Sequence, residues 1–278
     1  MAQTFSTSPR ALARGRLAAL CLVLAAMACL PAHAQRTQRA LDITGYVIDA
    51  EIDTATHHLA AKTVVTFTPP DAADSISFGF HPALRVTKIT DDAGKLLTGE
   101  RLVDGTLRVT PDTPLAKDTP AHWTFEYEGV ITGSEDGPIE GLKLAAIQEP
   151  VTYLLYAARW FPMTGFMTDR FTAEMHIKVP QGLHVFASGA VGGTHPATLA
   201  SGKPCEQYDF KWDAPSFPGT VIAGRFTGPY VAGPGNVKVW LTVAHQSSGN
   251  ALAQTAAKEF DFFTDSFGGL PDSRLNVV

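Results

Sequence analysis

Apolar and polar residues alternate with a period of two along most of the chain after residue 43. In the first such run, 44–53, one side carries Tyr46, Ile48 and Ile52, and the other side carries Asp49. Strict alternation over short runs is typical of strands that cover a core with one face. Similar runs occupy residues 59–67, 76–80, 107–109, 123–127, 171–179, 208–212 and 237–243. Since Gly, Pro and Asp separate these runs, we predict a mainly β fold, a large antiparallel sandwich or saddle.

Helical spacing replaces this alternation over residues 250–267. Ser248 is a suitable N-cap for a helix there, and Gly268 and Gly269 followed by Pro271 are a suitable stop signal. The apolar face expected for this helix consists of Leu252, Ala256, Phe260, Phe263 and Phe267.

The last four residues, Leu275–Val278, read as the beginning of a buried strand with nothing after it. We therefore expect residues 1–278 to be the front part of a longer protein, with Val277 and Val278 poorly packed. The expected organisation is a signal peptide at 1–34, a β domain at 35–245, and the first helix and strand of an α+β domain at 246–278.

The N-terminus has the three parts of an export signal. Three arginines precede an unbroken apolar run at 17–30, and residues 32–34 form an Ala-His-Ala cleavage site. The apolar run is shorter than the ~20 residues that cross a bilayer. We predict a secreted or periplasmic protein with no transmembrane segment after cleavage. Lipid modification of Cys29 is the alternative, although the preceding residues, 26–28, match such a site poorly.

Cysteine content and charge exclude two classes of protein. Cys21 and Cys29 lie in the expected signal, so Cys205 is the one cysteine of the mature chain and an internal disulfide is excluded. The formal net charge is −5, and no Lys-rich or Arg-rich run occurs. Because an acidic chain without a basic stripe binds nucleic acid poorly, we expect no nucleic-acid partner.

The histidines and nucleophiles form no recognisable catalytic pattern. His57 and His58 are neighbours on an expected strand, so their side chains should point to opposite faces. His176 falls on the polar side of its strand, where we expect it to be solvated. Ser188 lacks the first glycine of a nucleophile elbow, and Cys205 follows a Gly-Lys-Pro sequence expected to be a loop. We predict no metal site and no catalytic residue within this chain.

Aromatic residues are bunched along the expected strands. They could line a sugar-binding face, but their alternate spacing favours a core. In the segment Arg159–Pro162 we expect Trp160 and Phe161 to pack, the proline to end strand pairing and the arginine to cover an edge. The bunched aromatics are Phe78, Phe80, Trp123, Phe125, Tyr127 and Trp212.

Several segments, taken in order, carry a family resemblance. They are Tyr46–Asp53, Tyr156–Pro162, Asp169–Pro180, Phe217–Phe226 and Phe267–Pro271. With them, the chain from residue 43 onward resembles the N-terminal β domain of the aminopeptidase N-like (membrane alanine aminopeptidase) zinc metallopeptidases. The resemblance implies a domain that shapes and covers an active-site cleft for a peptide substrate, followed by a catalytic domain.

The chemistry that the resemblance implies belongs to that catalytic domain. In the family it binds zinc through His-Glu-x-x-His and a distant Glu, and Gly-x-Met-Glu-Asn binds the amino terminus of the substrate. This chain contains no His-Glu-x-x-His. We therefore expect no cofactor here, zinc in the missing domain, and no hydrolase activity from this chain alone.

In the family, the β domain also contributes a Gln or Glu side chain, from a Thr-Gln-x-Glu segment, that contacts the substrate. The aligned stretch here is Thr152–Leu155, with leucine in place of the glutamate. Gln148 and Glu149 could substitute as ligands of the substrate ammonium group. The alternative is that both are solvated loop residues, which is common for exposed polar side chains.

Three functions fit these observations. The parent could be an aminopeptidase that hydrolyses N-terminal residues of peptides. The chain could instead be a stand-alone secreted β-sandwich that binds a ligand or protein without catalysis. It could also belong to a zinc peptidase without aminopeptidase specificity. An in-frame His-Glu-x-x-His about 40–60 codons beyond codon 278 would favour a peptidase.

Overall fold

The computed structural model of the chain describes residues 41–133, 142–165, 168–233, 237–269 and 275–278. The fold of these residues is mainly β, as predicted. The expected signal peptide, most of a loop expected at 133–138, and Pro271 lie outside the described residues.

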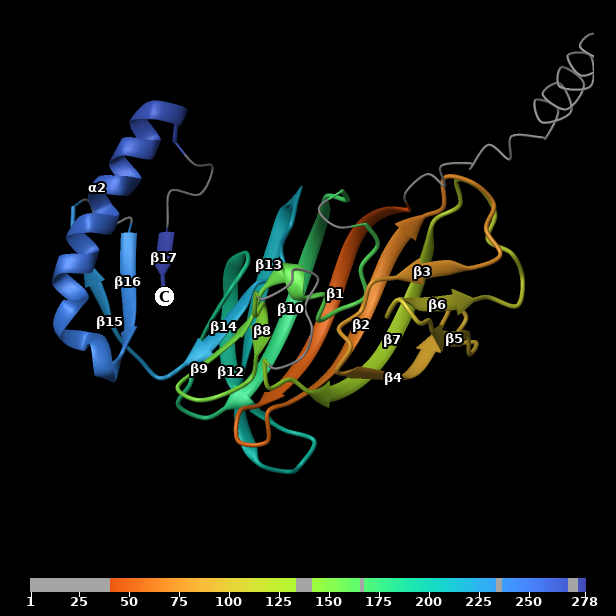
Figure 1. The fold of residues 1–278 in the computed structure, drawn as a ribbon, viewed down its shortest axis with the longest axis horizontal. Helices are drawn as coiled ribbons and strands as arrows, with labels where there is room; N and C mark the ends of the chain where they lie inside the picture. Colours follow the sequence, from red (N-terminus) through yellow and green to blue (C-terminus); the bar gives the residue numbers. More distant parts are fainter. Residues whose placement is uncertain (1–40, 134–141, 166–167, 234–236, 270–274) are drawn as a thin grey trace, which may run out of the picture. The chain divides into compact units, whose positions relative to one another are not determined.

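The largest sheet is a mostly antiparallel sheet of seven strands. These are β1 (Asp42–Asp53), β2 (His58–Thr68), β4 (Leu84–Thr90), β7 (Ala121–Val130), β10 (Phe171–Pro180), β12 (Ala190–Thr198) and β13 (Pro204–Ser216). They follow the order β12-β13-β10-β1-β2-β7-β4 (Figure 1). Within this sheet, β1 and β10 pair in parallel and the other neighbours are antiparallel.

Three smaller sheets complete the described strands. A four-stranded sheet contains β8 (Ala145–Ala146), β9 (Val151–Leu154), β11 (His184–Ala187) and β14 (Val221–Gly224). One three-stranded sheet contains β3 (Ile76–Phe78), β5 (Thr98–Arg101) and β6 (Leu107–Thr110). Another contains β15 (Phe226–Val231), β16 (Val237–Thr242) and β17 (Leu275–Val277). The helical segments are η1 (Tyr156–Ala158), η2 (Val243–Ser248) and α2 (Gly249–Phe267).

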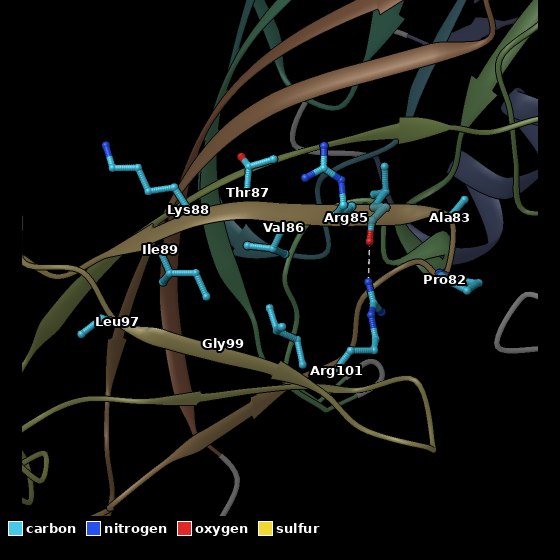
Figure 2. Close-up of a pocket in the computed structure, with 12 residues that line it drawn as sticks. Pro82, Ala83, Arg85, Val86, Thr87, Lys88, Ile89, Leu97, Gly99 and Arg101 are labelled. Carbon is cyan, nitrogen blue, oxygen red and sulfur yellow. Dashed lines mark hydrogen bonds between the residues drawn. The ribbon is translucent and has the colours of Figure 1, made fainter.

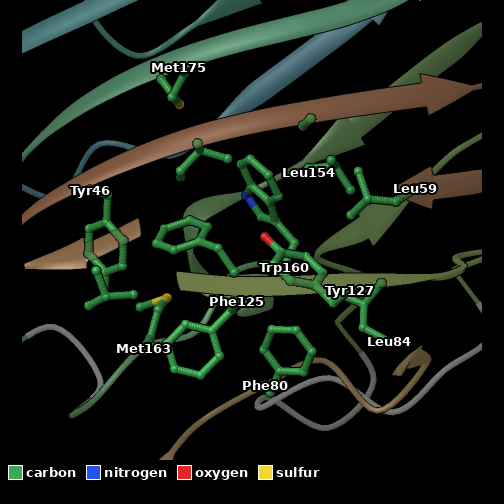
Figure 3. Close-up of a cluster of buried hydrophobic side chains, with 14 of the residues drawn as sticks. Tyr46, Leu59, Phe80, Leu84, Phe125, Tyr127, Leu154, Trp160, Met163 and Met175 are labelled. Carbon is green, nitrogen blue, oxygen red and sulfur yellow. The ribbon is translucent and has the colours of Figure 1, made fainter. Parts of the chain in front are cut away.

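One hydrophobic core joins the apolar face of the seven-stranded sheet to the sheets of β3 and β9. In β1, Tyr46, Ile48 and Ile52 are buried while Asp49 faces outward, as the alternation predicts. Figure 3 shows Phe125 and Tyr127 of β7 in the same cluster as Trp160, which follows η1. The bunched aromatics are therefore core residues, with the exception of the half-buried Trp212.

The helix occurs where it was predicted, but the expected apolar face was wrong in part: Ala256 and Phe260 are half-buried, and the other three residues are exposed. Its buried side chains include Ala253 and Ala257, because this face lies against β15 and β16 (Figure 1). In contrast, Leu252, Phe263 and Phe267 are 45%, 57% and 80% exposed. Small residues allow the helix to approach the sheet closely, so they take the inner face although larger apolar residues are present.

The two ends of this helical region also differ from expectation. Ser248 does occupy the N-cap position, but its side chain makes no capping hydrogen bond because η2 runs directly into α2. The strand expected to reach residue 243 ends at Thr242, and Val243 is exposed in η2. No helix of the described residues is long and apolar enough to cross a membrane.

The last residues form a strand, β17, which pairs in parallel with β16. The strand is not buried as its sequence suggested. Val277 and Val278 are 37% and 38% exposed, which confirms the expectation that they are poorly packed.

Candidate functional site

Four of the five segments that carry the family resemblance meet in one aromatic cluster, and Phe267–Pro271 is not among them. Tyr46 of β1 makes edge-to-face contacts with Phe161 and Phe171, at centroid distances of 5.0 Å and 4.6 Å. Tyr156 of η1 contacts Phe217 at 5.7 Å. Such aromatic pairs contribute about 0.5–1.5 kcal/mol beyond the area they bury. These segments therefore build a shared core around η1.

Two buried hydrogen bonds fix this cluster. The Tyr46 hydroxyl donates to the Pro162 carbonyl at 2.8 Å, and Trp160 Nε1 donates to the Gly219 carbonyl at 2.7 Å. Burial raises the pKa of Tyr46 well above its ordinary value, so this hydroxyl acts as a neutral donor. Trp160 and Phe161 are fully buried, which confirms the packing role predicted for them.

Arg159 was expected to cover a sheet edge, but both its backbone and its side chain have an unusual environment. Its backbone has a left-handed φ of 56°, which is uncommon for an arginine, and its side chain lies along Gly79. The Nε atom of Arg159 is buried and has no hydrogen-bond partner. Burial lowers the pKa of this guanidinium. The sequence motif gave no sign of this unusual environment.

Gln148 and Glu149, the predicted substrate ligands, lie on the surface just before β9. Both residues are exposed. The hydroxyl of Thr152 accepts from the Gln148 backbone N–H and donates to the Gln148 carbonyl, both at 3.0 Å, which holds this turn. A role for either side chain in binding substrate stays a prediction.

The stretch aligned with the family's Thr-Gln-x-Glu segment is a structural strand here. Thr152 and Leu154 of β9 are fully buried, and Tyr153 and Leu155 are half-buried. None of the four residues is acidic, so this strand cannot supply the carboxylate that the family resemblance implies.

The expected positions of His57 and Cys205 were wrong, whereas Ser188 has no catalytic surroundings, in line with the expectation for it. His57 lies in the turn before β2, with a φ of 57°, and its Nδ1 lies 2.6 Å from the Ile147 carbonyl oxygen. Cys205 is not in a loop: it is a buried residue of β13, and burial raises the pKa of its thiol. Ser188 Oγ accepts from the backbone N–H groups of Gly219 and Thr220, which is a structural role.

His176 is partly buried and bonded, where solvation was expected. Its Nδ1 lies 2.7 Å from Asp209 Oδ1 on the neighbouring strand, and its Nε2 lies 3.5 Å from Glu174 Oε1. His195 Nδ1 lies 3.5 Å from the other oxygen of Asp209. In the described part of the chain, no group of three or more His, Cys, Asp or Glu side chains could hold a metal ion.

Residues of alternating charge cross the polar face of the seven-stranded sheet in register. A first row joins strands β13, β10, β1, β2, β7 and β4. It consists of Asp209, His176, Asp49, Lys62, Glu126 and Lys88. Opposite charges on adjacent strands stabilise a sheet, so Asp49, Lys62, Glu126 and Lys88 support the pairing of β1, β2, β7 and β4. His176 adds a hydrogen bond to Asp209 between β10 and β13.

A second row is interrupted at β2. It runs from Lys178 through Glu51 to Ala60, and then through Glu128 to Arg85. The alternation would place a cation where Ala60 stands. A shallow groove of about 560 Å³ lies over both rows.

A crevice of about 430 Å³ lies between β4, the edge of the large sheet, and β5 (Figure 2). Arg85 and Lys88 point away from it toward the polar face, whereas Val86 and Ile89 point into it. Arg101 of β5 reaches across the crevice to the Leu84 carbonyl.

Comparison with known proteins gives a fold relationship. No family profile matches the sequence, and no curated protein is detectably similar to it. The structure is similar to the M1 zinc metallopeptidase from Deinococcus radiodurans, with a TM-score of 0.63 and 18% sequence identity over 86% of this chain. A variant of that enzyme bound to a Tyr-Ser-Ala substrate gives a TM-score of 0.61 at 18% identity.

The similarity concerns part of those enzymes. It covers 56% of the Deinococcus radiodurans chain in each of the two structures. At 18% identity the likeness establishes the fold, which resembles the N-terminal domain of the M1 metallopeptidases. The fold is therefore that of a β domain of the kind found in M1 zinc metallopeptidases.

Proposed function

We propose that this chain is the N-terminal part of a secreted zinc aminopeptidase-like metallopeptidase. Its β domain would shape and cover the active-site cleft, and the whole protein would hydrolyse N-terminal residues of peptides. The observation that carries this proposal is the fold shared with M1 zinc metallopeptidases, together with the meeting of four of the motif segments around η1.

The outer face of α2 supports this proposal. Phe262, Phe263 and Phe267 are 63%, 57% and 80% exposed, and the rings of Phe263 and Phe267 stack at 6.1 Å. Contiguous exposed aromatics on a helix mark surfaces that another part of a protein covers. A catalytic domain that continues from β17 would be placed to cover this face.

The described residues of this chain do not fit the zinc that the fold family implies. The described residues contain no group of three suitable ligands, and β9 carries no carboxylate at the aligned position. In this proposal, zinc and its ligands belong to the catalytic part of the complete protein. The β domain of this chain would restrict access to the cleft to peptides with a free N-terminus. The N-terminal signal would direct export of the protein.

The test is hydrolysis of an aminoacyl-4-nitroanilide with and without zinc. We expect no release of nitroaniline by residues 35–278. We expect zinc-dependent release by the complete product of the gene, with loss of activity after chelation. Zinc-dependent hydrolysis by residues 35–278 alone, or a complete product without zinc-dependent activity, would contradict the proposal.

Gln148 and Glu149 can be tested in the same complete product. If Glu149 binds the substrate ammonium group, Glu149→Gln should raise KM about tenfold or more, because a charge-assisted hydrogen bond is worth about 1.5–3 kcal/mol. Lys143→Gln is a matched control on an exposed residue of the same region. An equal KM for wild type, Glu149→Gln and Lys143→Gln would show that Glu149 does not bind the substrate.

A binding module without catalysis is the second candidate. The groove over the two charged rows favours it, because this groove offers about 560 Å³ lined by acidic and basic side chains of β1, β2, β7 and β10. A stop codon directly after codon 278, or a complete product that is inactive with zinc, would favour this function over the peptidase.

A further inference from the structure

The surroundings of Arg159 are built to hold its guanidinium. Gly79 leaves room for it: a Cβ atom at this position would lie 3.0 Å from Arg159 Cδ and 3.5 Å from Nη1. The Arg159 carbonyl accepts from the His81 backbone N–H at 2.9 Å, which fixes the left-handed backbone. The residue is half-buried, and its Nε–H has no acceptor. A buried N–H donor without an acceptor lowers the stability of the fold unless a ligand or another group accepts its hydrogen bond.

A second arginine, Arg101, contacts the same segment, 79–81. Arg101 Nη1 donates to the Phe80 carbonyl at 3.2 Å, its Nη2 donates to the Leu84 carbonyl, and its guanidinium lies 5.4 Å from the centroid of the Phe80 ring. Backbone carbonyl groups thus accept hydrogen bonds from the Arg101 guanidinium, but they do not neutralise its positive charge. Partial burial lowers the pKa of Arg101, and the charge of Arg159 lowers it further.

No carboxylate balances these two charges within the described residues. The ion pairs found there involve other cations, such as Arg85 with Glu128 and Lys88 with Glu126. The chain as a whole has a net charge of −5. Two arginines without a neighbouring acid are therefore a local region of positive charge in an acidic protein. Two neighbouring guanidiniums without an acid create the positive potential that anions seek.

We propose that Arg159, supported by the charge of Arg101, binds a carboxylate group. The planar guanidinium can donate two parallel hydrogen bonds to a carboxylate, and charge-assisted bonds of this kind are about twice as strong as neutral ones. The carboxylate could belong to the free C-terminus of a peptide or to an acidic side chain. This inference rests on Arg159 and Gly79, and it holds whether or not the protein is a peptidase.

The direct test follows the Arg159 Nε–H signal by ¹⁵N NMR while N-acetylglycine is added. N-acetylglycinamide, which lacks the carboxylate, is the matched ligand control. We expect a saturable shift with a Kd in the millimolar range for the acid and none for the amide. Absence of a saturable shift with the acid, or an equal shift with the amide, would overturn the proposal.

Two variants separate a binding role from a structural one. Arg159→Gln should weaken carboxylate binding about tenfold or more, given the usual strength of a charge-assisted bond. Arg170→Gln removes the same charge from an exposed arginine, and it should leave binding unchanged. If Arg159→Gln does not fold, Arg159→Lys keeps the charge but loses the Nε–H, and it should also bind more weakly. Wild-type affinity in the folded Arg159 variant would contradict the proposal.

Two further ligands identify the source of the carboxylate. A short alanine peptide with a free C-terminus should bind, and its amidated form should not, if the site takes a chain end. An amidated peptide with an internal glutamate should bind if the site takes a side chain. Binding of neither peptide, with N-acetylglycine also inactive, would overturn the assignment.

Discussion

The Tyr46 hydroxyl donates a 2.8 Å hydrogen bond to the Pro162 carbonyl, which lies 116 positions further along the chain. Both residues are buried, and the bond ties β1 to the segment that follows η1. Because the seven-stranded sheet and the aromatic cluster meet at this bond, it is a sensitive point of the fold.

Tyr46→Phe should lower the free energy of unfolding by about 1–3 kcal/mol, because it leaves the Pro162 carbonyl buried without a partner. Urea denaturation measures the change. Tyr153→Phe is the control, since Tyr153 is half-buried and its hydroxyl makes no hydrogen bond within the described residues. Equal stability of Tyr46→Phe and wild type would show that the bond contributes nothing.

Gly219→Ala should destabilise the protein by about 2–5 kcal/mol, from overpacking together with backbone strain. A Cβ at Gly219 would lie 2.7 Å from Phe161 Cε1, and the φ of 123° is strained for any residue with a side chain. Thermal unfolding is the measurement. Gly193→Ala is the matched control, because a Cβ there meets nothing within 4 Å. A similar Tm for both variants would contradict the argument.

The sequence predicted the strands well because one-sided burial leaves a local signal. In β1, the burial of Tyr46 and Ile48 and the exposure of Asp49 can be read from four consecutive residues. The same argument failed in part for α2. There the apolar residues cover more than one face, and close approach to β15 and β16 selects Ala253 and Ala257 over the larger side chains.

The candidate sites were harder to predict, because they depend on strand register. Asp49 and His176 are neighbours only because β1 pairs in parallel with β10, and no local pattern encodes that pairing. Likewise, the environment of Arg159 depends on Gly79, which directly follows β3 and lies 80 positions earlier in the chain. The polar positions were visible in the sequence, but their partners were not.

Ala60→Lys should raise the free energy of unfolding by about 0.2–1 kcal/mol, the usual contribution of a cross-strand charge pair. Ala60 lies in register between Glu51 and Glu128, where the charge alternation lacks its cation. Ala60→Glu is the matched control and should destabilise, because it adds a third negative charge to the row. Urea denaturation at low and high salt should show both effects shrinking with salt. An equal response of the two variants would exclude an electrostatic cause.

Asp209→Asn should lower stability at neutral pH by about 1–2 kcal/mol, the value of a hydrogen bond to a partly buried charge. Burial alone would raise the pKa of Asp209, but hydrogen bonds from His176 and Gln207 hold it below its ordinary value. An acid with a lowered pKa in the folded state stabilises the fold when it is ionised. Its contribution is therefore complete above the unfolded pKa of about 3.9 and is lost as the pH falls through the folded value.

The difference in unfolding free energy between wild type and Asp209→Asn should accordingly be constant near neutral pH and shrink in acid. Urea denaturation at a series of pH values between neutrality and strong acid measures it. Asp213→Asn is the control, since Asp213 is exposed and pairs only with Lys211 among the described residues. A difference that grows as the pH falls would mean that Asp209 is held protonated, and that its bonds to His176 and Gln207 do not stabilise the charged form.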